Sequence, residues 1–185
     1  MQFQSKKDMK AIPAQIRGNE LSKFLDQIRA DYAKLSSVGR IEGLVIADQD
    51  AKVLAVNTFF DTKMNYWDIG AIGAALYGVA KQGKDFFQAE DIDRTAMIYK
   101  NRQFFVQTIG TIVMPNQRKR ELILIVLGDK QLNIGLVMMQ MMKHAPQIKS
   151  HVEQDVQIQS TMQMSETEFM KHLGDVKKEL FELAK

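Results

Sequence analysis

The segment from Tyr66 to Lys84 constrains the fold more than any other part of the sequence. It has the spacing of a helix, but it carries no charged residue between Ile69 and Ala80. A helix that is apolar nearly all round must be covered on more than one side. Two stripes share its surface, one of large residues and one of mostly small residues: Ile69, Ile72, Leu76 and Val79, then Gly70, Gly73, Ala74, Tyr77 and Ala80.

A sheet of the same chain can cover only one side of this helix. Small residues on the other side would let a second helix approach closely, which favours a partner subunit. Another helix of the same chain is the alternative source of cover. We therefore predict that this helix and the strand expected over residues 94–100 form a dimer interface. Its predicted contact residues are Gly70, Gly73, Ala74, Tyr77, Met97 and Tyr99.

The strand signals lie on both sides of this helix. Residues 41–47 and 121–127 are apolar on both faces, so both strands are expected at the centre of a sheet. The first leads through an acidic turn into a second run at 52–57, which indicates a hairpin. Residues 94–100 and 103–109 have the pattern of another hairpin. The sequence thus predicts five strands.

Further helices are expected before and after these strands. Residues 20–36 have apolar positions three and four apart, with Asn19 as the N-cap. A helix from Asn133 is expected to reach His144, where Pro146 either kinks it or starts a new segment. Residues 153–164 are rich in glutamine and are interpreted as a linker or a frayed helix. A capping box at Ser165 begins a last amphipathic helix.

This order of elements predicts an α+β fold with a single, mostly antiparallel five-stranded sheet and helices on both faces. The predicted organisation is a flexible tail over 1–17, a domain over 18–157, and a linker with a C-terminal amphipathic helix over 158–185. The chain has no cysteine, which excludes disulfides and thiolate chemistry. No stretch is long enough to cross a bilayer and the start is not apolar, so the cytoplasm is the expected location.

A catalytic constellation is not found. There is no Gly-x-x-x-x-Gly-Lys phosphate loop and no Gly-x-Ser-x-Gly elbow. Asp48 and Asp50 are interpreted as turn residues, with a cation site as the alternative. His144 and His151 are expected to be solvated rather than metal-bound. We therefore predict a protein that is not an enzyme and that holds no cofactor or metal.

Several runs are similar to the roadblock/dynein-light-chain family. They are Ile41–Asp48 with Lys52–Ala55, Ile69–Leu76, Leu122–Leu127 and Asn133–Leu136, within about residues 19–155. The chain departs from the family at Ala51, where glycine is common, and in its two terminal extensions. The resemblance implies a roadblock/longin-like fold and a dimer, either with itself or with a roadblock paralogue. In such dimers the middle helices pair and the third strands meet edge to edge.

The resemblance also implies a function without substrate turnover. Members bind and regulate Ras-like small GTPases, some by stimulating GTP hydrolysis, or act as structural adaptors in motor or membrane-tethered complexes. A small-molecule sensor is a third possibility. Nucleic acid and direct membrane insertion are not expected, since the formal charge is only +3 and no aromatic residues accompany the basic run. The candidate partner-binding residues are Arg118, Lys119, Arg120, Phe169, Leu173 and Leu180.

Overall fold

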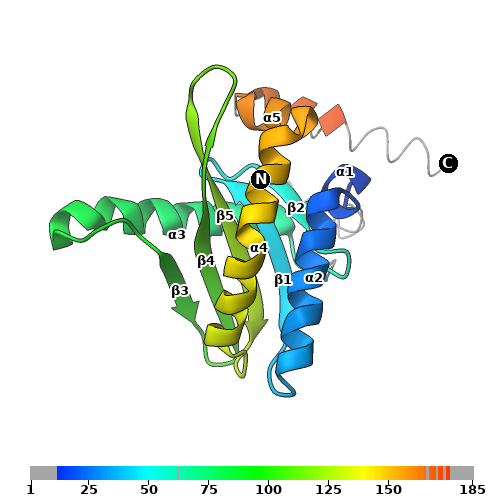
Figure 1. Ribbon diagram of the computed structural model, residues 1–185, viewed down its shortest axis with the longest axis vertical. Coiled ribbons are helices and arrows are strands. Elements are labelled where there is room, and N and C mark those ends of the chain that lie inside the picture. Colours follow the sequence, from blue (N-terminus) through cyan, green and yellow to red (C-terminus); the bar gives the residue numbers. More distant parts are fainter. Residues whose placement is uncertain (1–11, 62, 166, 170, 173, 176–185) are drawn as a thin grey trace, which may run out of the picture.

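The computed structural model describes residues 12–61, 63–165, 167–169, 171, 172, 174 and 175, and within them the chain forms one antiparallel sheet of five strands (Figure 1). The strands lie in the order β2-β1-β5-β4-β3, so β2 and β3 are its two edges. Their bounds are β1 Ile41–Asp48, β2 Val53–Val56, β3 Arg94–Ile98, β4 Arg102–Val113 and β5 Lys119–Asp129. The predicted α+β fold is confirmed.

The two strands that are apolar on both faces lie inside the sheet, as expected. β1 pairs with β5, with Val45 opposite Ile125 and Leu44 opposite Val126. All four of these side chains are buried. Because successive side chains point to opposite faces, each strand contributes to two separate cores. These two contributions explain the continuous apolar runs in the sequence.

Helices cover both faces of the sheet. Leu44 and Val126 belong to the core under α2 (Glu20–Leu35) and α4 (Ile134–Gln154). Val45 and Ile125 belong to the core under α3 (Tyr66–Phe87) on the opposite face. Figure 1 shows α2 and α4 side by side in front of the sheet, while α3 runs behind it and extends beyond the strands.

The C-terminal part of the domain is longer and more ordered than the sequence predicts. α4 does not end at His144 but continues through Pro146, because Ile148 and Val152 are fully buried beyond it. The predicted linker is a further helix, α5 (Val156–Gln163). The Asp155 side chain caps it by accepting hydrogen bonds from two backbone amides of its first turn. Of the two interpretations of this stretch, a linker and a frayed helix, the helix agrees with the structure.

The predicted flexible tail over residues 1–17 is wrong for its last residues. The short helix α1 (Ala14–Arg17) packs beside β2. Ile16 is buried, and Arg17 donates a hydrogen bond from Nε to the carbonyl oxygen of Thr58 at 2.6 Å. Residues 1–11 lie outside the described residues. The domain therefore begins before residue 18.

Candidate interaction surfaces

The face of α3 that packs against the sheet of its own chain is the face that was predicted to contact a partner subunit. Gly70, Gly73, Ala74 and Tyr77, predicted to contact a partner subunit, are buried against the sheet of their own chain. Ile72 and Val79 of the large apolar stripe face outward instead, whereas Ile69 and Leu76 are half-buried and pack against the same core. Ile72 is 47% exposed and Val79 is 68% exposed. The prediction that the small residues form the dimer contact is therefore wrong, whereas the prediction of an apolar surface on both sides of the helix is correct.

The glycines explain why this face packs against the sheet, because they let α3 lie close to it. A Cβ atom added at Gly70 would lie 2.6 Å from Cγ2 of Val53 on β2. A Cβ atom at Gly73 would lie 2.7 Å from Cγ1 of Ile125 on β5. Neither separation is sterically possible without a shift of the helix or of a buried side chain. Small residues therefore serve the contact between helix and sheet.

We expect Gly73→Ala to lower the free energy of unfolding by about 1–2 kcal/mol, because the added methyl overpacks a central part of the core. Gly78 lies on the same helix, and a Cβ added there would meet no atom within 4 Å. Gly78→Ala is the matched control and should stabilise the protein by about 0.5–1 kcal/mol, since alanine favours the helix. Urea denaturation of both variants measures the difference. Equal effects of the two substitutions would contradict the close packing at Gly73.

The outward face of α3 and the edge strand β3 together form an exposed apolar surface. Besides Ile72 and Val79, it includes Phe86 near the end of α3, which is largely exposed, whereas Ile98 of β3 points to the opposite face of the sheet. Met97 is half-buried and packs against the core on the α3 side. Tyr99 is exposed in the turn after β3. Met97 and Tyr99 thus stay at this predicted interface, next to the unpaired edge of β3.

The basic run divides into two parts. Arg120 pairs with Asp50, and its side chain is mostly buried. It therefore holds the turn between β1 and β2 and is a poor candidate for partner binding, contrary to the prediction. Arg118 and Lys119 are exposed where β4 turns into β5. These two cations remain candidates for contact with an acidic partner.

The acidic turn contains a buried ion pair that the sequence does not predict. Asp48 is fully buried, and its Oδ1 accepts hydrogen bonds from the backbone amides of Asp50 and Lys52, each at 2.9 Å. The turn interpretation of Asp48 is thus correct. Burial raises the pKa of Asp48, against the opposing effect of the backbone hydrogen bond and the charge of Lys52. Ala51 takes a positive φ of 66°, a backbone geometry that favours glycine.

Lys52 joins this turn to the C-terminal part of the domain. Its side chain is almost fully buried, and Nζ lies 3.5 Å from Oδ2 of Asp48. Nζ also donates a hydrogen bond to the carbonyl oxygen of Met162 at 3.1 Å. That carbonyl belongs to the last turn of α5, where unpaired carbonyl groups favour a cation. Lys52 therefore caps the C-terminal end of α5.

A polar cluster joins α2 to α4. Asp31 accepts hydrogen bonds from Lys143 at 2.7 Å and from Lys34 at 3.1 Å. These two ammonium groups hold the pKa of Asp31 well below its usual range. His144, predicted to be solvated, is buried with Nε2 3.3 Å from Asp31. That prediction is wrong for His144, because α4 turns this side chain towards α2.

Phe169 is buried within the chain itself. Its ring meets that of Trp67 edge to face, with 5.5 Å between the ring centres. Phe169 is therefore not available as a partner contact in this arrangement, contrary to the prediction. Leu173 and Leu180, the other two candidates in this segment, lie outside the described residues. The start of the C-terminal segment docks on its own domain.

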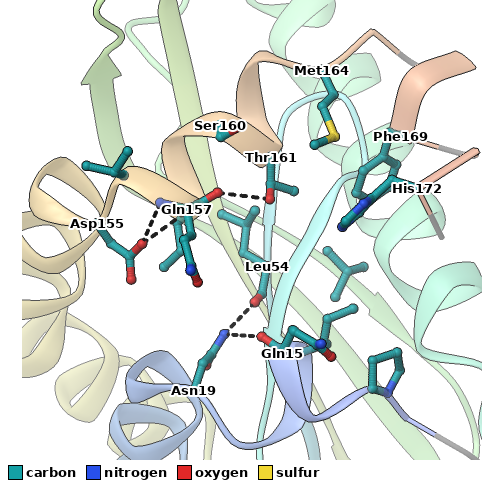
Figure 2. A pocket seen from close by; sticks show the side chains of 15 residues that line it. Gln15, Asn19, Leu54, Asp155, Gln157, Ser160, Thr161, Met164, Phe169 and His172 are labelled. Atoms are coloured by element: carbon teal, nitrogen blue, oxygen red, sulfur yellow. Dashed lines mark hydrogen bonds between the residues drawn. The ribbon is translucent and has the colours of Figure 1, made fainter. Parts of the chain in front are cut away.

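A cavity of about 600 Å³ lies between α1, β2 and α5 (Figure 2). Three of its polar side chains, Asn19, Asp155 and Thr161, bond to nearby backbone. Asn19 Nδ2 donates to the carbonyl oxygens of Gln15 and Leu54 at 2.7 and 2.9 Å, and the Thr161 hydroxyl donates to that of Gln157 at 3.0 Å. Gln15, Gln157, Ser160 and His172 line the cavity as well, so polar groups remain that could orient a small ligand. No pattern in the sequence indicates this cavity, because its walls come from the supposed tail and linker.

Among the residues placed by the structure, no group of three or more histidine, aspartate or glutamate side chains could hold a metal ion. Within the same residues, no helix is both long and apolar enough to span a membrane.

Comparison of the sequence with protein-family models and with curated proteins gives no match. Solved structures give clear matches. A Roadblock/LC7 domain from Streptomyces avermitilis superposes with a TM-score of 0.57 at 14% identity, over 72% of this chain and 98% of that one. MglB of Myxococcus xanthus superposes with a TM-score of 0.55 at 9% identity, over 83% of this chain and 96% of that one. The gliding protein MglB from Thermus thermophilus superposes with a TM-score of 0.51 at 9% identity, over 78% of this chain and 98% of that one. The chain therefore has the fold of the roadblock/LC7 domain, as its sequence resemblance implied.

Proposed function

We propose that this chain is a non-catalytic, dimeric interaction module that binds and regulates a Ras-like small GTPase. The exposed apolar face of α3 beside the unpaired edge of β3 is the observation that carries the proposal. The roadblock/LC7 fold supports it, because the sequence resembles a family whose members bind such GTPases. A structural adaptor without nucleotide dependence is the alternative.

Two uncovered features of the protomer support the proposed dimer, namely the apolar outer side of α3 and the unpaired edge of β3. Ile72, Val79 and Phe86 recur at seven-residue intervals, so they lie on one side of α3. A continuous apolar surface of this kind typically marks a protein–protein interface. β3 is an edge strand with unpaired backbone groups along one side. A two-fold axis beside β3 would pair the two β3 strands and bring the outer faces of the two α3 helices together.

Regulation without catalysis fits the chemistry of the described residues. The buried polar groups at the β1–β2 turn and between α2 and α4 hold the fold together through bonds within the chain. Arg118 and Lys119 offer exposed cations at the tip of the β4–β5 hairpin. A GTPase surface that changes with the bound nucleotide could then be recognised through shape and charge, with the nucleotide held by the GTPase itself.

We expect the purified dimer to bind a Ras-like GTPase from its own organism with at least about tenfold different affinity for the GTP-analogue and GDP forms, about 1.4 kcal/mol. Fluorescence anisotropy with labelled nucleotide measures this. Arg118→Glu combined with Lys119→Glu should weaken binding, whereas Val156→Glu, which adds a glutamate at a 78% exposed position on α5, is the surface control. Binding that ignores the nucleotide would favour the adaptor. GTP or ATP turnover by the protein alone would contradict the non-catalytic proposal.

A further inference from the structure

The cavity between α1, β2 and α5 has the size and the lining of a small-molecule site. Its volume is about 600 Å³, within the range of roughly 300–1,000 Å³ that is typical of such sites. Ile16 of α1, Leu54 of β2 and Ile158 of α5 line it, and all three side chains are buried. Phe169, in the segment after α5, adds a buried aromatic ring. The deeper part of the cavity is therefore apolar.

Polar side chains lie on the solvent side of the same cavity. Gln15, Gln157, Ser160 and His172 line it, and all four residues are exposed. Figure 2 shows Gln15, Gln157 and His172 around one space, although they come from three separate segments. Within the described part of the chain these four side chains make no hydrogen bond. They are therefore available to the polar end of a ligand whose apolar end lies deeper.

The charges around the cavity decide the kind of polar end. Of the described residues, none that lines the cavity is a lysine or an arginine, the side chains that usually hold phosphate. The carboxylate of Asp155 is part of the lining, and it already accepts hydrogen bonds from the backbone amides of Gln157 and Ile158. It thus takes the place that an anion would occupy at the start of α5. A nucleotide or another phosphate compound does not suit this cavity.

An uncharged head group fits the polar side chains better. The amides of Gln15 and Gln157 and the hydroxyl of Ser160 can each donate and accept a hydrogen bond. Hydroxyl groups of a ligand have the same two capacities, so they can pair with all three side chains. Burial of a hydrocarbon chain supplies most of the affinity, and the hydrogen bonds orient the head group.

We propose that this cavity binds an uncharged amphipathic molecule of the monoacylglycerol class. Its acyl chain lies against Ile16, Leu54 and Phe169, and its hydroxyl groups bond to Gln15 and Gln157. The inference depends neither on the proposed dimer nor on the GTPase partner. Because α1 and α5 come from opposite ends of the described domain, such a ligand stabilises the docking of both on β2.

The test uses the intact protein and monodecanoylglycerol, kept below the concentration at which it forms micelles. Trp67 is the single tryptophan of the chain, and its ring contacts that of Phe169, so ligand entry should change its fluorescence. We expect saturation at one molecule per chain and a melting temperature that rises with ligand concentration. Decanoate, with a charged head, should bind at least tenfold more weakly. Glycerol, which has no chain, should not bind at roughly 1 mM.

Two variants of α5 locate the site. Ser160→Phe places a ring in the cavity at an exposed position and should weaken binding of monodecanoylglycerol at least tenfold. Gln163→Phe places the same ring at an exposed position outside the lining and should bind as the wild-type protein does. Circular dichroism checks that both variants are folded.

Three results would overturn the inference. The first is the absence of saturable binding of monodecanoylglycerol by the wild-type protein up to roughly 1 mM. The second is equal binding by folded Ser160→Phe and by Gln163→Phe, which would place the ligand elsewhere. The third is binding of decanoate as tight as that of monodecanoylglycerol, which would contradict the uncharged head group.

Discussion

Replacing both Ile72 and Val79 by glutamate is expected to convert the proposed dimer into a monomer that remains folded. The two side chains are 47% and 68% exposed on the outer face of α3, so their loss leaves the core of the protomer intact. In the dimer each glutamate would be buried in an apolar contact without a partner, at a cost of several kcal/mol. The dissociation constant should therefore rise by roughly 10³-fold or more. Light scattering at micromolar concentration measures the mass.

Val156→Glu is the control for this substitution, since it places the same charge on an exposed apolar position of α5, away from α3 and β3. Its mass should equal that of the wild-type protein. Circular dichroism should show both variants folded. A double variant that keeps the dimeric mass would contradict the assignment of this face. Gly73→Glu would not serve as the test, because that position is packed against Ile125 and the substitution would unfold the protomer.

The helix of residues 66–87 shows what helical periodicity determines and what it leaves open. The pattern correctly predicts a helix with two apolar stripes, and the structure places the helix on the sheet. It does not say which stripe meets the sheet, since both are apolar. Gly70 and Gly73 decide the matter through distance, because only glycine permits so close an approach to Val53 and Ile125. This close approach of the helix to the sheet is a property of the tertiary structure. The spacing of apolar residues in the sequence does not reveal it.

The sequence predicts the two terminal segments poorly for a different reason. Residues 156–163 contain only two buried apolar side chains, Ile158 and Met162, among glutamines, so their helical pattern is weak. α5 is held instead by contacts distant in sequence, above all the hydrogen bond from Lys52 to the Met162 carbonyl. Ile16 in α1 is likewise buried only because β2 lies beside it. The candidate site was predictable in its elements, α3 and β3, but not in its individual residues.

The docking of α5 on the core leads to the other large expected effect. Met162 is fully buried in the core under α2 and α4. Met162→Ala should lower the free energy of unfolding by about 2–5 kcal/mol, because it leaves a cavity in that core. For a chain of this size the melting temperature should fall by roughly 5–15 °C. Met139, 60% exposed on α4, is the matched control, and Met139→Ala should change stability by less than about 0.5 kcal/mol.

Deleting residues 160–185 should lower stability at least as much as Met162→Ala. The deletion removes Met162 and Phe169 from the core, and it removes the carbonyl group that accepts a hydrogen bond from Lys52. Lys52 would keep Asp48 as its ion-pair partner but lose the cover of α5. Thermal unfolding of the deletion beside Met162→Ala tests whether α5 is part of the domain. If the truncated protein melted at the wild-type temperature but no longer bound the proposed GTPase partner, the segment would be a recognition helix, and the packing of Met162 would contribute nothing to the fold. We expect the opposite, because a carbonyl and a methionine side chain are both buried where α5 meets the core.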